Sequence, residues 1–118
     1  MFYWDTSATA TIAYTEIFSA LRRHVRETVL RESQYDEVAR RFLREWPAYV
    51  RVNLDERILE CTRALLERYP LRTLDAIHLA SAIKMQDHLD EPSVFISADT
   101  QLLRAATAEH LETKRLSL

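Results

Sequence analysis

The feature that most constrains the fold is a stretch that is apolar nearly all round when it is read as a helix. After Thr73 the chain runs Leu-Asp-Ala-Ile-His-Leu-Ala-Ser-Ala-Ile-Lys-Met, which is rich in alanine. A surface helix keeps one polar face, whereas a helix that is apolar all round belongs in the interior. The sequence therefore predicts that this helix is the most buried one of the protein.

Short apolar runs alternate with helical patterns along the chain. The predicted strands are residues 1–4, 9–13, 49–54, 93–97 and 114–118, and the predicted helices are 15–31, 33–46, 55–69, 73–85 and 101–109. Residues suited to N-capping stand at four helix starts, namely Thr15, Ser33, Asp55 and Asp99. This alternation predicts one α/β domain over residues 1–118, with a short, mostly parallel sheet of roughly four or five strands flanked by helices.

Composition excludes several classes of protein. Glycine is absent, so the chain has no Gly-rich phosphate loop of the Walker or Rossmann type. No apolar run approaches the roughly 18 residues of a membrane span, and the N-terminus lacks a secretory pattern. Cys61 is the single cysteine, which excludes an internal disulfide and predicts a core-filling role in a reducing compartment. We therefore expect a cytoplasmic protein that does not contact a membrane.

Four carboxylates occupy one kind of place in this architecture. Asp5 and Asp99 follow apolar strands, and Glu16 and Asp75 lie in the first turns of helices. In a parallel sheet these places fall on the carboxyl edge, where converging carboxylates raise one another's pKa unless a cation neutralises them. Oxygen ligands without His or Cys select Mg²⁺ or Mn²⁺ over zinc. The alternative is that all but Asp5 are ordinary capping or first-turn acids.

Four segments, in this order, resemble the successive acidic motifs of PIN domains. They are Trp-Asp-Thr-Ser at 4–7, Tyr-Thr-Glu at 14–16, Leu-Asp-Ala-Ile-His-Leu-Ala-Ser-Ala at 74–82 and Ile-Ser-Ala-Asp at 96–99. Within that family the residues most resemble the VapC-type toxin ribonucleases of toxin–antitoxin systems. The resemblance covers nearly the whole chain and implies a PIN-like three-layer fold.

The resemblance also implies an activity. VapC-type proteins are Mg²⁺- or Mn²⁺-dependent endoribonuclease toxins of type II toxin–antitoxin pairs, which hydrolyse RNA phosphodiester bonds with metal-activated water. The catalytic and metal-binding positions fall on Asp5, Glu16, Asp75 and Asp99, and supporting hydroxyls fall on Thr6 and Ser97. A small inhibitory antitoxin and a homodimer are implied as well. The alternatives are a PIN-like scaffold that binds RNA or protein without cleavage, and a mostly helical interaction module whose acids lie far apart.

One departure from the family pattern concerns the segment after the first strand. In PIN domains a longer segment, with one or two helices and a strand, separates the first acidic motif from the second. Here ten residues lie between Asp5 and Glu16, too few for a crossover between parallel neighbours, which takes about a dozen or more. Either the protein has lost this element, which puts activity in doubt, or a segment is missing near residues 7–9. We favour the missing segment, because both flanking motifs match well.

Other polar and aromatic residues near these motifs have two readings each. A basic helix face beside the acids, formed by Arg22, Arg23 and Arg26, predicts contacts with RNA phosphates, although such a face is often only solvated. His78 lies one turn after Asp75 and predicts hydrogen bonding in the core or beside the acids rather than general-base catalysis. Tyr14 either stacks on a base or packs as a buried aromatic residue.

Overall fold

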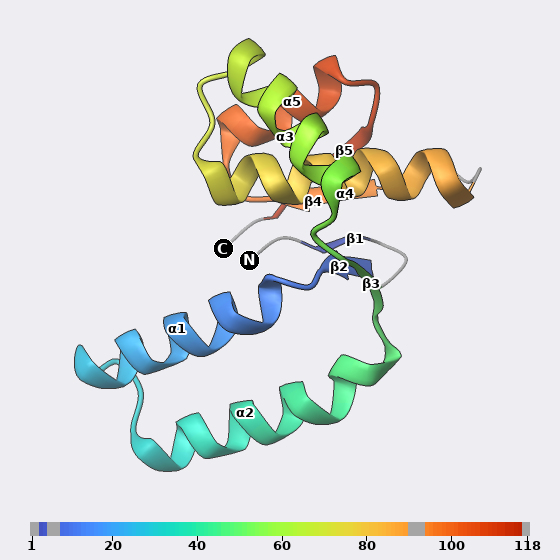
Figure 1. Ribbon diagram of the computed structural model, residues 1–118. Coiled ribbons are helices and arrows are strands. Elements are labelled where there is room, and N and C mark those ends of the chain that lie inside the picture. Colours follow the sequence, from blue (N-terminus) through green and yellow to red (C-terminus); the bar gives the residue numbers. More distant parts are fainter. Residues whose placement is uncertain (1–2, 5–7, 90–93, 117–118) are drawn as a thin grey trace.

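A computed structural model of the protein describes residues 3–4, 8–89 and 94–116 (Figure 1). In chain order its elements are β1 (Tyr3–Trp4), β2 (Ala8–Ala10), α1 (Ala13–Arg26), α2 (Glu32–Glu45), the short 3-10 helix η1 (Trp46–Ala48), β3 (Val50–Val52), α3 (Glu56–Arg68), α4 (Thr73–Leu89), β4 (Val94–Ser97), α5 (Thr100–Ala108) and β5 (Glu112–Arg115). The predicted α/β class is confirmed. No helix among the described residues is long and apolar enough to cross a membrane.

The strands form two small sheets instead of the single sheet that the sequence predicted. One sheet has the order β1-β4-β5, and the other pairs β2 with β3. The pairs β2–β3 and β4–β5 are parallel, as predicted, whereas β1 is antiparallel to β4. Three residues separate β1 from β2, and about a dozen or more are needed to cross over between parallel neighbours. β1 therefore cannot lie parallel beside β2, and the described strands form no continuous parallel sheet.

The direction of β1 matters for the predicted site. Tyr3 lies opposite Ile96 and Trp4 opposite Phe95, so β1 runs toward the amino end of β4. The edge at which Asp99 follows β4 is the opposite one. Residues 5–7 lie outside the described part of the chain, so the place of Asp5 and the missing segment near residues 7–9 both stay predictions.

Helix α4 is the centre of the core, as predicted. Leu79, Ala76, Ala80 and Ala82 are 0 % exposed, and the helix packs between α3 and the strands. Small alanine side chains let neighbouring elements approach closely, and each fully buried large apolar side chain contributes about 1.5–3 kcal/mol. Cys61 on α3 packs against this core as a half-buried residue, and burial raises the pKa of its thiol.

Helices α1 and α2 form an arm that projects from the rest of the protein (Figure 1). Ala13 and Ala39 are the buried residues of the two helices. Aromatic rings hold the arm together: Tyr14 lies 5.2 Å from Phe18 and Phe18 lies 5.8 Å from Phe42, measured between ring centroids. Tyr14 is 37 % exposed, so the reading of Tyr14 as a buried aromatic residue is wrong.

Two of the four predicted N-caps are confirmed. Asp55 accepts a hydrogen bond from the Ile58 N–H at 3.0 Å, and Asp99 accepts one from the Leu102 N–H at 3.1 Å. Each carboxylate satisfies one of the N–H groups that the first helical turn leaves without a partner. The starts of α3 and α5 were therefore readable from the sequence.

The other two N-caps were predicted wrongly. Helix α1 begins at Ala13, because Ile12 already has helical backbone angles, and the Thr15 hydroxyl donates back to the Ile12 carbonyl at 2.9 Å. Helix α2 begins before Ser33, with Arg31 as its cap, and the Arg31 N–H donates to the Gln34 side chain at 2.9 Å. In both cases a residue inside the first turn was mistaken for the cap.

A chain without glycine must turn with other residues, and one of them is strained. Thr28, just after α1, has a φ of 57°, a left-handed conformation that is costly for a β-branched residue. We expect Thr28→Gly to raise the free energy of unfolding by about 0.5–1 kcal/mol, measured by urea denaturation. Glu27→Gly is the matched control: Glu27 has a φ of −87°, so this change should destabilise, and equal effects of the two substitutions would contradict the explanation.

Candidate active site

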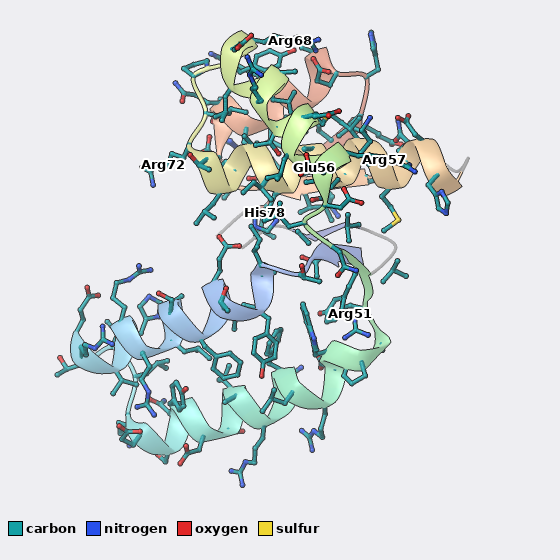
Figure 2. All side chains as sticks on the ribbon, in the orientation of Figure 1. Arg51, Glu56, Arg57, Arg68, Arg72 and His78 are labelled. Carbon is teal, nitrogen blue, oxygen red and sulfur yellow. The ribbon has the colours of Figure 1, made fainter. Side chains whose placement is uncertain are left out.

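A hydrogen bond between Glu16 on α1 and His78 on α4 connects the arm to the core. Glu16 lies in the first turn of α1, and its Oε1 is 2.5 Å from Nε2 of His78 on α4. His78 is 2 % exposed, and the Glu16 side chain is 28 % exposed. Figure 2 shows His78 on the side of α4 that faces α1. The predicted hydrogen-bonding role of His78 is confirmed, and its partner is one of the four predicted acids.

Asp75 lies among like charges in the first turn of α4. Burial raises its pKa most, and the Asp99 carboxylate raises it further, with a smaller contribution from Glu16 in the same direction. His78 and Arg72 act in the opposite direction, since positive charge favours the ionised carboxylate. The fold therefore brings the Asp99 and Glu16 carboxylates close enough to Asp75 to raise its pKa.

Ser97 positions the backbone at the last of these acids. Its side chain is 0 % exposed at the end of β4, and its Oγ accepts a hydrogen bond from the Asp99 N–H at 3.0 Å. The Ser97 carbonyl accepts from the Leu116 N–H at 2.9 Å, which extends the pairing of β4 with β5. Asp99 thus caps α5 and lies close enough to Asp75 to raise its pKa, whereas its role in the site stays a prediction.

The donor chemistry of these residues fits a hard divalent cation. A bound Mg²⁺ or Mn²⁺ would favour the charged form of Asp75, which burial and Asp99 disfavour, and carboxylate oxygen is the ligand that these ions prefer. Within residues 3–4, 8–89 and 94–116, no three acidic, His or Cys side chains are grouped closely enough to hold a metal by themselves. Asp5 and Thr6 lie outside these ranges, so their predicted metal and supporting roles stay predictions.

The basic residues of the arm and of the start of α4 have different surroundings. Arg22 pairs with Glu32 at 3.0 Å and stacks over the Tyr35 ring at 3.9 Å, so it joins α1 to α2. Arg23 and Arg26 are exposed on the same helix, and their contact with RNA stays a prediction. Arg72 was not predicted, although its charge lowers the pKa of Asp75. It lies three residues before Asp75, next to the start of α4, and this spacing could have indicated the interaction.

We expect His78→Ala to lower the free energy of unfolding by about 2–4 kcal/mol, because it leaves a cavity in the core and removes the partner of Glu16. The measurement is urea denaturation of the single variants His78→Ala and Glu16→Ala and of the double variant. A coupling energy of about 1–3 kcal/mol in this double-mutant cycle would show that the two residues act as a pair. Additive effects would contradict the assignment.

In this α/β fold Asp99 follows the end of β4, and Glu16 and Asp75 lie in the first turns of α1 and α4. The sequence pattern of the PIN domain matches residues 4–108, so the chain belongs to the PIN domain family, whose members are generally metal-dependent nucleases. No curated protein and no solved structure matches the chain. The α/β class and the order of the acidic motifs are those that this family implies.

Proposed function

We propose that this protein is a Mg²⁺- or Mn²⁺-dependent endoribonuclease, acting as the toxin of a type II toxin–antitoxin pair. The observation that carries the proposal is the place of Asp75 in the first turn of α4, one turn before His78, which is hydrogen-bonded to Glu16 in the first turn of α1. Burial and the nearby Asp99 raise the pKa of Asp75 there. A carboxylate whose pKa is raised by burial and by a neighbouring acid is typical of functional sites. The VapC-like motifs support the finer assignment, and the single, free Cys61 fits action in the reducing cytoplasm.

The residues have separable roles in phosphodiester hydrolysis. A bound divalent cation supplies Lewis-acid stabilisation and lowers the pKa of water, and Asp75 and Asp99, together with Asp5, would hold it. One oxygen of Glu16 is engaged by His78, which orients the carboxylate so that its other oxygen can accept a proton from the attacking water. His78 is a positioning residue in this scheme. Ser97 holds the backbone of Asp99 in place.

The test compares two acids that both cap helices: Asp99, which belongs to the proposed site, and Asp55, which lies outside it. Asp99→Asn should abolish cleavage of single-stranded RNA in Mg²⁺ or Mn²⁺, whereas Asp55→Asn should cleave like the wild type. Both variants should fold, because asparagine is as good an N-cap as aspartate. Asp5→Asn should also abolish cleavage. Undiminished cleavage by both Asp5→Asn and Asp99→Asn would refute the site.

A second candidate is a PIN-like scaffold that binds RNA or protein without cleavage. The short segment between β1 and β2 and the antiparallel direction of β1 favour it, because they separate the end of β1 from the edge that holds Asp99. Calorimetric binding of Mn²⁺ with no cleavage of any RNA in a mixed pool would establish the scaffold. Mn²⁺-dependent cleavage that EDTA stops would exclude it.

We further propose that the arm is the surface for a second copy of the chain or for an antitoxin. Large apolar side chains are exposed there, with Val29 at 65 %, Val38 at 41 % and Leu43 at 44 %, and exposed apolar groups mark interaction surfaces when they gather. Sedimentation of the wild type as a dimer, and of Leu43→Glu as a monomer, would support the homodimer. The matched control is Leu59→Glu on α3, since Leu59 is exposed to 46 %.

A further inference from the structure

A pocket of about 530 Å³ lies where the arm joins the rest of the protein. Residues from the β2–α1 turn and from the η1–β3 segment line it, among them Thr11, Tyr14, Trp46, Tyr49, Arg51 and Asn53. Thr11 and Asn53 directly follow the parallel strands β2 and β3, at whose ends Ala10 pairs with Val52. Ligands of parallel sheets bind at this carboxyl edge, and the volume is within the usual range for a small ligand.

The pocket and the acidic site share one turn of helix. Tyr14 lines the pocket and Glu16 belongs to the acidic site, and both lie in the first turn of α1. One helical turn advances only about 5.4 Å along its axis. Residues two positions apart on a helix point to different sides of it, so a polymer that meets the acids on one side of α1 would reach the pocket by passing around the start of the helix.

The aromatic side chains of the pocket offer ring faces to a ligand. The Trp46 ring lies 5.4 Å from Tyr14, edge to face, and 6.1 Å from Tyr49. These contacts also hold η1 against α1, which is the structural role of the cluster. Tyr14 remains 37 % exposed, however, and Trp46 and Tyr49 are only half-buried. Aromatic faces that stay open beside a charged groove are the platforms on which bases of single-stranded nucleic acid stack.

The polar side chains of the pocket complement a nucleotide. Arg51 is exposed, with its guanidinium 5.7 Å from the Trp46 ring centroid, and Figure 2 shows it where η1 meets β3. Asn53 is exposed, and its side-chain amide has no hydrogen-bond partner among the described residues. An amide presents donors and an acceptor to a base edge, and a guanidinium binds phosphate. Aromatic rings, an amide and a guanidinium together match a base, its edge and its phosphate.

We propose that this pocket binds an unpaired base of single-stranded RNA, with Tyr49 as a stacking platform, Asn53 at the base edge and Arg51 at the adjoining phosphate. The assignment as a substrate subsite rests on the proposed ribonuclease function. A base within a duplex cannot enter, because its faces and its pairing edge are occupied. The pocket therefore selects single-stranded RNA and sets a base preference.

The test measures binding without cleavage, by fluorescence anisotropy of labelled RNA octamers of each base in EDTA. Tyr49→Leu should raise the dissociation constant about tenfold, whereas Tyr49→Phe should stay within about twofold of the wild type, since the ring is kept. Asn53→Ala should reduce the difference in affinity between octamers. Arg51→Gln should weaken binding and lower the slope of log K against log salt by about one, whereas Arg63→Gln, at an exposed site on α3, should change neither.

The outcomes separate this proposal from the proposed function. If Asp99→Asn abolishes cleavage while Tyr49→Leu, Asn53→Ala and Arg51→Gln bind RNA like the wild type, the subsite is overturned and the nuclease assignment stands. If the wild type cleaves no RNA but Tyr49→Leu loses affinity, the pocket is supported and the nuclease assignment fails. Equal affinity for single-stranded and duplex RNA would also overturn the subsite. Far-ultraviolet circular dichroism confirms that each variant is folded.

Discussion

Replacing Asp75 with asparagine should abolish RNA cleavage and at the same time raise the melting temperature at pH 7. Cleavage should fall by at least about 100-fold, because changes to groups that merely surround metal ligands already cost about 10–100-fold. The melting temperature should rise by roughly 2–4 °C, because the charged carboxylate is partly buried beside Asp99 and Glu16. Residues that serve function at a cost in stability show this combination.

The stability effect of Asp75→Asn should depend on pH in a defined direction. The folded-state pKa of Asp75 is raised above its ordinary value of 3.8, so the folded protein holds this proton more tightly than the unfolded chain does. The stabilisation that this proton provides is complete below pH 3.8 and is lost as the pH rises through the folded-state pKa. The difference in melting temperature between variant and wild type should therefore be near zero at low pH and grow toward pH 7.

A matched control for Asp75 is a first-turn acid outside the site. Glu56 lies in the first turn of α3 and is exposed. Glu56→Gln should leave cleavage unchanged and lower the free energy of unfolding by about 0.3–1 kcal/mol, because an acid near a helix N-terminus is normally stabilising. Stabilisation by both substitutions would mean that the Asp75 effect does not come from the neighbouring carboxylates.

The largest loss of stability is expected from Phe95→Ala. Phe95 is 1 % exposed on β4, which lies between β1 and β5 and leads to Ser97. Truncation removes buried apolar area and leaves a cavity, at a cost of about 3–5 kcal/mol. This is a large part of the roughly 5–15 kcal/mol that separates folded and unfolded states of a domain. Urea denaturation should show an unfolding midpoint far below that of the wild type.

Two further variants test the cause of this effect. Phe95→Leu keeps most of the apolar volume and should retain the cooperative transition. Leu74→Ala removes a large apolar side chain that is 47 % exposed, and it should change the free energy of unfolding by no more than about 0.5 kcal/mol. A loss for Leu74→Ala as large as that for Phe95→Ala would contradict the placement of the core around β4 and α4.

Much of the local structure was predictable from the sequence. The apolar periodicity identified α4 as the buried helix, and the acids before α3 and α5 identified their first turns through Asp55 and Asp99. These features depend on residues that are a few positions apart in the sequence, so the local order of residue types is enough to predict them. The starts of α1 and α2 were missed because Thr15 and Ser33 are good caps by type, and only the backbone of Ile12 and Arg31 shows where the helices begin.

What the sequence by itself determined is the α/β class, the burial of α4 and the caps of α3 and α5. What only the tertiary structure decided is how distant segments meet. Glu16 bonds to His78 across 62 positions, β1 lies antiparallel to β4, and the aromatic pocket joins Tyr14 to Arg51. Such contacts depend on the length of each crossover and on the packing of the arm, and no local pattern of residues encodes either.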